Sequence, residues 1–332
     1  MIKWIKSHQK LLIICSFAYI YVLFLLVLPR PFQAITPGEI TNVEQVIQID
    51  GITMNTDFYT VSVISYRPIT PFQSMIIELD QKSSMRALSA RQKDTTLLES
   101  YRQGQITKEV SYHMAVIQAY EMAKVIDQDV SIDYAYQGLI VYYRPSYFKD
   151  LNIGDVIVEI NGESYSDHTH ETFLERAYAS TVHLKVRQTQ SSGDVLEKMV
   201  TYHYQENDQR MIFYPKYDIL SANPHYSFPG LNQVTGGPSG GLMQTLSIYA
   251  SLVNINTNQL IIVGTGTIEF GGSVGLVGGL PQKLYAAQRG KADLFFMPKA
   301  LENQIPNTDF DFEIILVETL EEAIYELHQR LI

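Results

Sequence analysis

The longest apolar run of the chain occupies residues 11–28 and contains no charged side chain. As an α-helix, a run of this length extends about 27 Å, which is just long enough to cross the hydrocarbon core of a bilayer. We therefore expect a transmembrane helix at residues 11–28.

The charges on either side of this run predict its orientation. Three lysines lie within residues 1–10, whereas Arg30 is the only charged residue close behind the run. By the positive-inside rule, residues 1–10 form a cytoplasmic tail, and the rest of a single-pass cell-membrane protein is extracellular. A cleaved signal peptide is the alternative, but the run is long for one and no small-x-small cleavage site follows Leu28.

The next part of the chain alternates between strand-like and helix-like patterns. Residues 43–49 and 56–65 alternate as two strands, and a polar stretch follows at residues 81–105. Residues 110–126 then predict a helix, because their apolar positions recur on one face. That face is formed by Ala115, Ala119, Met122, Ala123 and Ile126.

A second unit follows, with strands and one helix in a recognisable order. Residues 136–141 read as a short strand that opens with a glycine turn, and residues 151–162 as a strand that ends in Asn-Gly. A helix is expected near residues 171–178 and a strand at residues 182–187. The simpler interpretation of this segment is that its Asn-Gly marks an ordinary β-hairpin.

Within this unit, residues 151–162 read Leu-x-x-Gly-Asp-x-Ile-x-x-Ile-Asn-Gly, which resembles the signature of PDZ domains. The resemblance implies a PDZ domain at residues 128–208. It also implies a carboxylate-binding loop in which backbone N–H groups capture the end of an extended peptide. By resemblance, the residues of that peptide-binding loop are Tyr136, Gln137, Gly138 and Leu139.

The strongest chemical signal is a serine within glycines. Residues 236–241 read Gly-Gly-Pro-Ser-Gly-Gly, and an apolar run at 242–250 follows directly. That run predicts a buried helix with Ser239 at its positive end, where backbone N–H groups can approach an oxyanion. A serine nucleophile needs a base, and Lys283 can serve if burial keeps its amine neutral.

These two segments resemble those of the Lon-type serine proteases. Gly-Pro-Ser-Gly-Gly before an apolar helix is similar to their nucleophile segment, and residues 264–287 are similar to their lysine segment. The similarity continues through residues 295–298 and 314–317 to a helix that begins at Leu320. It thus covers about the last 125 residues in the right order, which is more specific than either motif alone.

The resemblance implies that Ser239 is the nucleophile and Lys283 the general base. Gly237, Pro238 and Gly240 are then expected to support the oxyanion through the backbone, and Thr265 to support the dyad. Two positions depart from Lon itself, because Gly236 and Thr267 stand where acidic residues are expected. In both, the chain is closer to small membrane-anchored relatives that join a PDZ module to a Lon-like domain.

Other interpretations of the same residues remain open. The serine motif also fits a nucleophile elbow, but that fold needs an acidic residue and then a histidine later in the chain. The only histidine after Ser239 is His328, four residues from the end of the sequence, so too little chain remains to build such a triad on separate loops. A purely structural interpretation is also open for each residue. Gly-Pro-Ser-Gly-Gly can be a turn that caps a helix. Lys283 can be a solvated lysine on a helix, and Thr265 can be an ordinary threonine in a strand.

Composition narrows the range of partners. With 332 residues, of which 46% are hydrophobic, the chain is globular, and its net charge of −10 argues against nucleic acid. Its single cysteine, Cys15, lies in the apolar run, so no intrachain disulfide is expected. The sequence contains no phosphate-binding loop motif, so we expect no ATP. His168-Thr169-His170 could suggest a metal site, but no cluster of further metal ligands accompanies it, so we expect no metal or other cofactor.

The expected fold is α+β: a Lon-type protease domain, a mainly β PDZ module and one transmembrane helix. Residues 29–127 hold juxtamembrane strands and a helix, and residues 209–332 the Lon-like domain. We expect residues 43–127 to complete the protease fold around an inserted PDZ module. A separate N-terminal spacer domain is the alternative.

The predicted function is that of an ATP-independent, membrane-anchored serine endopeptidase. Its substrates would be extracytoplasmic peptides or flexible protein segments, docked with help from the PDZ module. The resemblance to pheromone-processing members of the family in Gram-positive bacteria makes a secreted signalling peptide one candidate substrate. An oligomer is compatible with the sequence. The alternative function is a non-catalytic, membrane-tethered PDZ scaffold that binds peptides.

Overall fold

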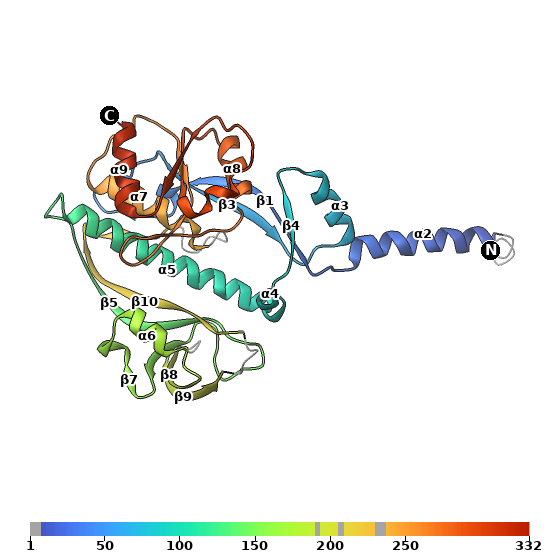
Figure 1. Ribbon diagram of the computed structural model, residues 1–332, viewed down its shortest axis with the longest axis horizontal. Coiled ribbons are helices and arrows are strands. Elements are labelled where there is room, and N and C mark those ends of the chain that lie inside the picture. The colour runs from blue at the N-terminus through green and yellow to red at the C-terminus, as the bar shows by residue number, and fades with distance from the viewer. Residues whose placement is uncertain (1–7, 190–192, 205–208, 230–236, 332) are drawn as a thin grey trace.

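The computed structural model describes residues 8–189, 193–204, 209–229 and 237–331. In these parts the chain forms an apolar N-terminal helix, a mixed sheet flanked by helices, and a second, antiparallel sheet (Figure 1). A long helix, α5 (Leu97–Lys124), runs between the two sheets (Figure 1).

The N-terminal helix α2 (Gln9–Val27) projects from the rest of the molecule (Figure 1). Among the described residues it is the one helix long and apolar enough to cross a membrane. No part of its apolar window is buried inside the protein, unlike the core helix of a soluble domain. The helix predicted at residues 11–28 is therefore present, displaced by one or two residues.

The first sheet has six strands in the order β16-β15-β12-β3-β1-β4. The bounds of its strands are β1 Phe32–Asn42, β3 Phe58–Tyr66, β4 Ser84–Ala87, β12 Ile262–Gly264, β15 Leu294–Pro298 and β16 Glu313–Val317. Pairing is parallel between β3 and β12, between β12 and β15, and between β15 and β16. It is antiparallel between β1 and both of its neighbours, β3 and β4. Strands from the two ends of the chain thus hydrogen-bond within one sheet.

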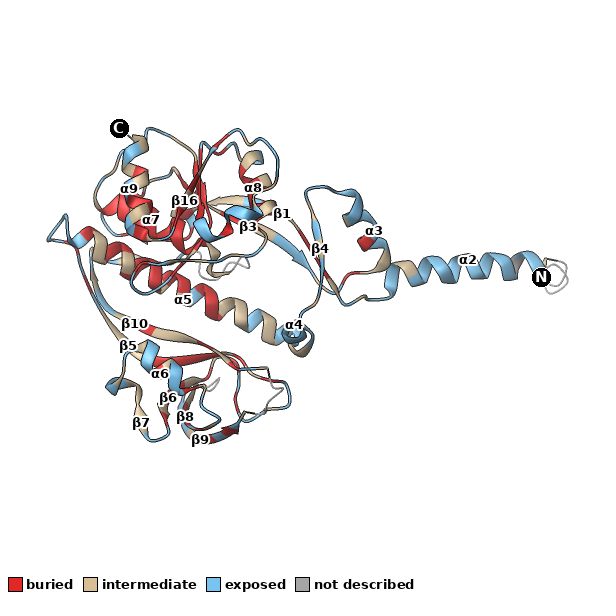
Figure 2. Ribbon diagram, in the orientation of Figure 1, coloured by how far each residue is buried: buried red, intermediate tan, exposed pale blue. Residues whose placement is uncertain are grey.

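Helices cover both faces of this sheet. One face carries α5, α7 (Gly241–Leu252) and α9 (Leu320–Leu331), whose apolar residues share a core with Phe58 and Phe296. The other face carries α8 (Leu280–Arg289), which packs with Val263 and Phe295. Successive residues of a strand point to opposite faces, so Phe295 and Phe296 belong to different cores. All residues of α7 are buried, between α5 and the sheet (Figure 2).

The second sheet has the order β10-β5-β6-β8-β9 and its own apolar core. The bounds of its strands are β5 Ser131–Tyr143, β6 Val156–Ile160, β8 Thr181–Thr189, β9 Val195–His203 and β10 Ile212–Asn223, with β7 Glu163–Ser164 paired to β6. The helix α6 (His170–Arg176) packs against β5. The remaining strands and α-helices of the described residues are β2 Gln48–Ile49, β11 Tyr226–Ser227, β13 Thr267–Ile268, β14 Val274–Gly275, α3 Pro71–Leu79 and α4 Ala90–Asp94.

Two sequence-based boundaries need correction. The expected division between residues 208 and 209 cuts the second sheet, because β10 lies beyond it and pairs with the whole length of β5. Only the end of the strand expected at residues 43–49 is present, as β2 at Gln48–Ile49: a 3₁₀ turn occupies Val43–Gln45, and the longer strand lies earlier, as β1. Val43 in that turn and Val46 and Ile47 after it are buried by tertiary contacts, and the sequence pattern does not distinguish such residues from those of a strand.

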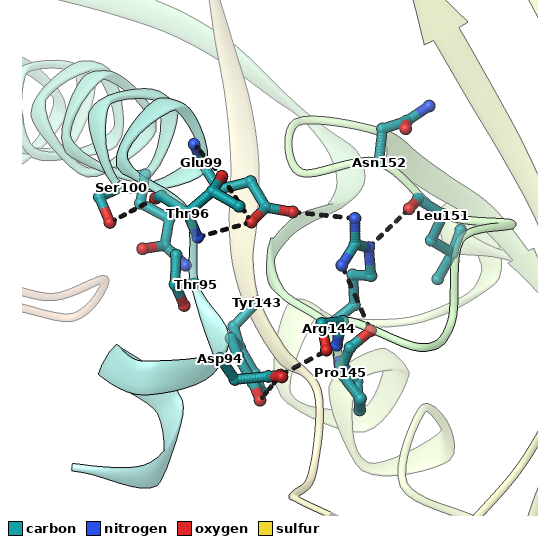
Figure 3. A network of polar contacts seen from close by, with 12 residues as sticks. Asp94, Thr95, Thr96, Glu99, Ser100, Tyr143, Arg144, Pro145, Leu151 and Asn152 are labelled. Atoms are coloured by element: carbon teal, nitrogen blue, oxygen red, sulfur yellow. Dashed lines mark hydrogen bonds and ion pairs between the residues drawn. The ribbon is translucent and has the colours of Figure 1, made fainter.

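A polar network joins the first part of the chain to the second sheet (Figure 3). Arg144, just after β5, pairs with Glu99 of α5 at 2.9 Å, and its Nε donates to the Leu151 carbonyl. Asp94 of α4 accepts a hydrogen bond from the Tyr143 hydroxyl at 2.9 Å. Burial acts to raise the pKa of Glu99, but hydrogen bonds from Thr96 and the charge of Arg144 lower it overall. The network therefore ties the start of α5 to the end of β5.

Candidate active site

Ser239 lies in a single 3₁₀ turn, Pro238–Gly240, that runs directly into α7. Its side chain is partly exposed, whereas the helix behind it is buried. The N-terminus of a helix carries unpaired N–H groups and partial positive charge. Ser239 is thus a partly exposed residue at the positive end of a buried helix.

The loop after β12 holds this turn in place. The Ser239 carbonyl accepts hydrogen bonds from the Gly266 N–H at 2.9 Å and from the Thr265 hydroxyl at 3.0 Å. In return, the Leu242 N–H donates to the Gly266 carbonyl at 3.1 Å. The backbone around Ser239 is therefore clamped from both sides by residues 265–266.

Lys283 reaches the same place from α8. It is only 2% exposed, and its Nζ donates to Thr265 Oγ1 at 2.7 Å. Burial lowers the pKa of Lys283 to about 7. An amine at this pKa is neutral in a large fraction of molecules near neutral pH, which a general base requires.

Thr265 connects the two groups. Its hydroxyl hydrogen is directed to the Ser239 carbonyl, so its oxygen accepts from the Lys283 amine. A neutral amine that donates one N–H to Thr265 keeps its lone pair free to accept a proton. No hydrogen bond between described residues joins Ser239 Oγ directly to Lys283 Nζ. Catalytic hydrogen bonds are often long before substrate binds.

Tight packing explains the glycines after the serine. A Cβ on Gly240 would lie 2.9 Å from Thr60 Cγ2, and one on Gly241 would lie 3.0 Å from the Ile268 nitrogen. Neither position has room for a side chain unless its neighbours move. The glycine run thus lets α7 start close against β3 and the β13–β14 hairpin.

Gly237, Pro238 and Gly240 are expected to support the oxyanion through the backbone, but not all three can donate a hydrogen bond. Pro238 has no N–H and cannot donate to an oxyanion, but its carbonyl accepts from Ser111 Oγ of α5 at 3.2 Å. Gly237 and Gly240 retain backbone N–H groups. The Gly236 position, one of the two departures from Lon, lies outside the described residues.

Sequence reasoning missed Ser111 and Thr60. Both contact the serine turn from the first part of the chain, more than 120 residues upstream. A serine inside a helix and a threonine inside a strand carry no motif. Only the joining of distant segments in one core brings them to the site.

The four residues expected to form a peptide-binding loop lie inside a strand. Tyr136, Gln137, Gly138 and Leu139 are all part of β5, so the prediction of a loop here is wrong. The glycine signal belongs to a β-bulge: Gly138 has φ +111°, and the pairing of β5 with β10 shifts by one residue there. Because β10 pairs on both sides of the bulge, the strand continues through it.

Comparisons with known proteins point in one direction. The chain matches the family described as the Lon protease (S16) C-terminal proteolytic domain over residues 144–329. It is 31% identical over 151 residues to the Lon protease of Vibrio parahaemolyticus, covering 42% of this chain and 18% of that protein. Identity to the Lon protease of Rickettsia prowazekii is 27% over 176 residues, covering 51% and 22%. The chain thus spans about a fifth of the length of these relatives.

Proposed function

Because the chain belongs to the family of the Lon protease proteolytic domain, as its serine and lysine segments predicted, we propose that it is a serine endopeptidase with a Ser239/Lys283 dyad. The observation that carries this proposal is the buried Lys283 amine beside the turn that holds Ser239. An ordinary surface lysine is charged at neutral pH and cannot accept a proton.

In the proposed reaction, neutral Lys283 takes the proton of Ser239 Oγ as that oxygen attacks the scissile carbonyl. Backbone N–H groups of Ser239 and its neighbours in the turn before α7 stabilise the oxyanion of the tetrahedral intermediate. The resulting ammonium of Lys283 then returns the proton to the leaving amine. Water deprotonated by the same amine attacks the acyl-enzyme, which releases the second product and restores the serine.

The proposed setting is the outer face of a cell membrane. The support is α2, an exposed apolar helix of membrane-spanning length at the N-terminal end of the described chain. In this setting the enzyme cleaves extracytoplasmic peptides or flexible protein segments, and turnover requires no nucleotide. A secreted signalling peptide is one such substrate.

Docking of the peptide is proposed for the second sheet, as a PDZ-like module. β5 pairs with β6 only at Leu139 and Ile140, and α6 packs beside β5. An extended peptide could add to the segment that includes Tyr136 and Gln137. The Ser239→Ala variant should then bind an extended peptide more tightly than the same peptide N-methylated at alternate residues, because strand addition uses backbone N–H groups of the peptide. Equal affinity for the two peptides would refute strand addition.

The test of the proposed activity uses the full chain in lipid nanodiscs with a library of unstructured peptides and no ATP or metal. Mass spectrometry compares the wild type with Ser239→Ala and Lys283→Ala. Cleavage that both substitutions abolish supports the dyad and yields the sequence preference. Normal cleavage by either variant contradicts the dyad, and binding without cleavage by the wild type favours the scaffold.

A further inference from the structure

Helix α3 (Pro71–Leu79) turns its apolar side away from the protein. Four large apolar side chains are spaced at i, i+3, i+4 and i+7 and so share one helix face. Their exposed fractions are 44% for Phe72, 55% for Met75, 50% for Ile76 and 85% for Leu79. The opposite side, which faces the protein, carries buried Ser74 and half-buried Ile77 (Figure 2). This arrangement is the reverse of that in a helix on a water-soluble surface.

The position of α3 explains what can cover this face. The Arg30 N–H, three residues after α2, donates to the Ile69 carbonyl, two residues before α3, at 2.8 Å. The start of α3 is therefore fixed at the level where α2 ends. Figure 1 shows α3 beside the C-terminal end of α2, which it contacts.

α3 is also fully formed without help from a partner. Pro71 starts the helix, and Thr70 and Gln73 form a reciprocal capping box. Ser74 Oγ donates to the Thr70 carbonyl at 3.1 Å on the protein-facing side. The exposed apolar face thus belongs to a helix that is already formed, so covering it needs no folding of the segment.

We propose that α3 is a membrane-interface helix, whose apolar face lies in the headgroup and upper acyl region of a phospholipid bilayer. The inference rests on the membrane anchoring proposed above, because α2 would bring the bilayer surface to α3. A short amphipathic helix of this kind lies in the plane of the interface with its apolar face about 5–10 Å deep. A bilayer that surrounds the apolar surface of α2 would also cover the adjoining apolar face of α3.

The consequence for the site follows from the segment after α3. The Lys82 carbonyl accepts a hydrogen bond from Gln282 Nε2 at 3.3 Å, and Gln282 directly precedes Lys283 on α8. Docking α3 in the interface therefore fixes the orientation of the α8 segment relative to the membrane. An enzyme held in this orientation favours substrates whose peptide segments lie close to the membrane surface.

The test uses the fact that Cys15 is the only cysteine in the sequence. In the full chain with Cys15→Ser, a cysteine at Met75→Cys is labelled with an environment-sensitive fluorophore. The protein is reconstituted in vesicles of phosphatidylcholine and phosphatidylglycerol, with and without brominated lipids. We expect blue-shifted emission that lipids brominated near the headgroup quench more strongly than lipids brominated at the chain ends.

Two controls separate the possible outcomes. Glu78→Cys, on the polar flank of the same helix, should remain solvent-like and unquenched. Native Cys15, labelled in the unsubstituted chain, should be quenched by lipids brominated deep in the acyl chains, and its failure refutes the anchoring itself. A quenched Cys15 with a solvent-like Met75→Cys label overturns only the α3 proposal. Blue-shifted emission without lipid quenching also overturns it, because a protein then covers the face.

Discussion

At the scale of the residue, the chemistry depends on the environment of one amine. Lys283 is buried, and burial lowers its pKa to about 7 from the ordinary value of 10.5. Its hydrogen-bond partner is the neutral Thr265 hydroxyl, and a neutral acceptor does not hold the ammonium form as a carboxylate would. The same burial that makes Lys283 a base therefore costs the folded state free energy.

The activity should depend on pH through this group. As pH falls below about 7, Lys283 takes up a proton, and kcat/KM should fall about tenfold per pH unit. The measurement is a pH–rate profile of the full chain with a peptide substrate. Lys283→Arg should be inactive at every pH, because guanidinium does not deprotonate. A profile that is flat from pH 5 to about 9 would contradict the assignment of Lys283 as the base.

Lys283→Met should stabilise the fold while abolishing activity. Between the folded pKa of about 7 and the unfolded value of 10.5, the unfolded chain binds the extra proton, so stability rises with pH. At and below pH 7 the folded state bears the full cost of the buried amine. Removing it should raise the free energy of unfolding by an amount on the order of 2–4 kcal/mol.

Denaturant unfolding at several pH values checks this stabilisation. The gain should be largest at pH 7 and below and should vanish above about pH 10.5, where both states are neutral. Lys124→Met, at an exposed position at the end of α5, is the matched control and should show no such pH-dependent gain. A loss of stability in Lys283→Met at pH 7 would show that the amine is not buried as described.

At the scale of the element, prediction succeeded where periodicity was strong and local. The apolar helix after Ser239 and the helix from Leu320 are α7 and α9. The helix predicted at residues 110–126 is α5, but it starts at Leu97. Its first turns are polar or exposed and are defined by the capping box of Thr96 and Glu99, not by an apolar face.

The turn before α7 makes a prediction at this scale. Gly241→Ala places a Cβ 3.0 Å from the Ile268 nitrogen and 3.1 Å from Ser111 Oγ. The helix start must shift away from the β13–β14 hairpin, so we expect a loss of about 1–3 kcal/mol in stability and a marked loss of peptidase activity. Thermal unfolding and peptide cleavage measure the two effects. Gly278→Ala, where the added Cβ meets no atom within 4 Å, should leave the stability unchanged.

At the scale of the whole molecule, distant parts of the chain build one core. Strand β12, which leads to Thr265, pairs with β3 from the first part of the chain as well as with β15. Helix α7 packs on α5, and Ala115 and Ala119 share the core with Leu246. The second sheet lies between these segments in the sequence and is tied to α5 by the Arg144–Glu99 pair.

Residues 209–332 should therefore not fold by themselves, although they contain both Ser239 and Lys283. Without β3 and α5, the fully buried face of α7 would be exposed to water, and β12 would lose one of its two neighbours. Circular dichroism and thermal unfolding should show no cooperative transition for this fragment, in contrast to the full chain. A cooperative transition would show that the first part of the chain is a separate unit.

The sequence by itself determined the family, the α2 helix and the pairing of Ser239 with Lys283 as a hypothesis. These rest on local signals: an uncharged apolar run, a glycine-rich turn and a motif order within about 50 residues. Only the tertiary structure decided that Lys283 is buried against Thr265, and that Ser111 and Thr60 support the serine turn. It also placed Gly138 in a bulge instead of a loop. Burial and strand pairing depend on which distant segments meet, and a local pattern of residues carries no record of that.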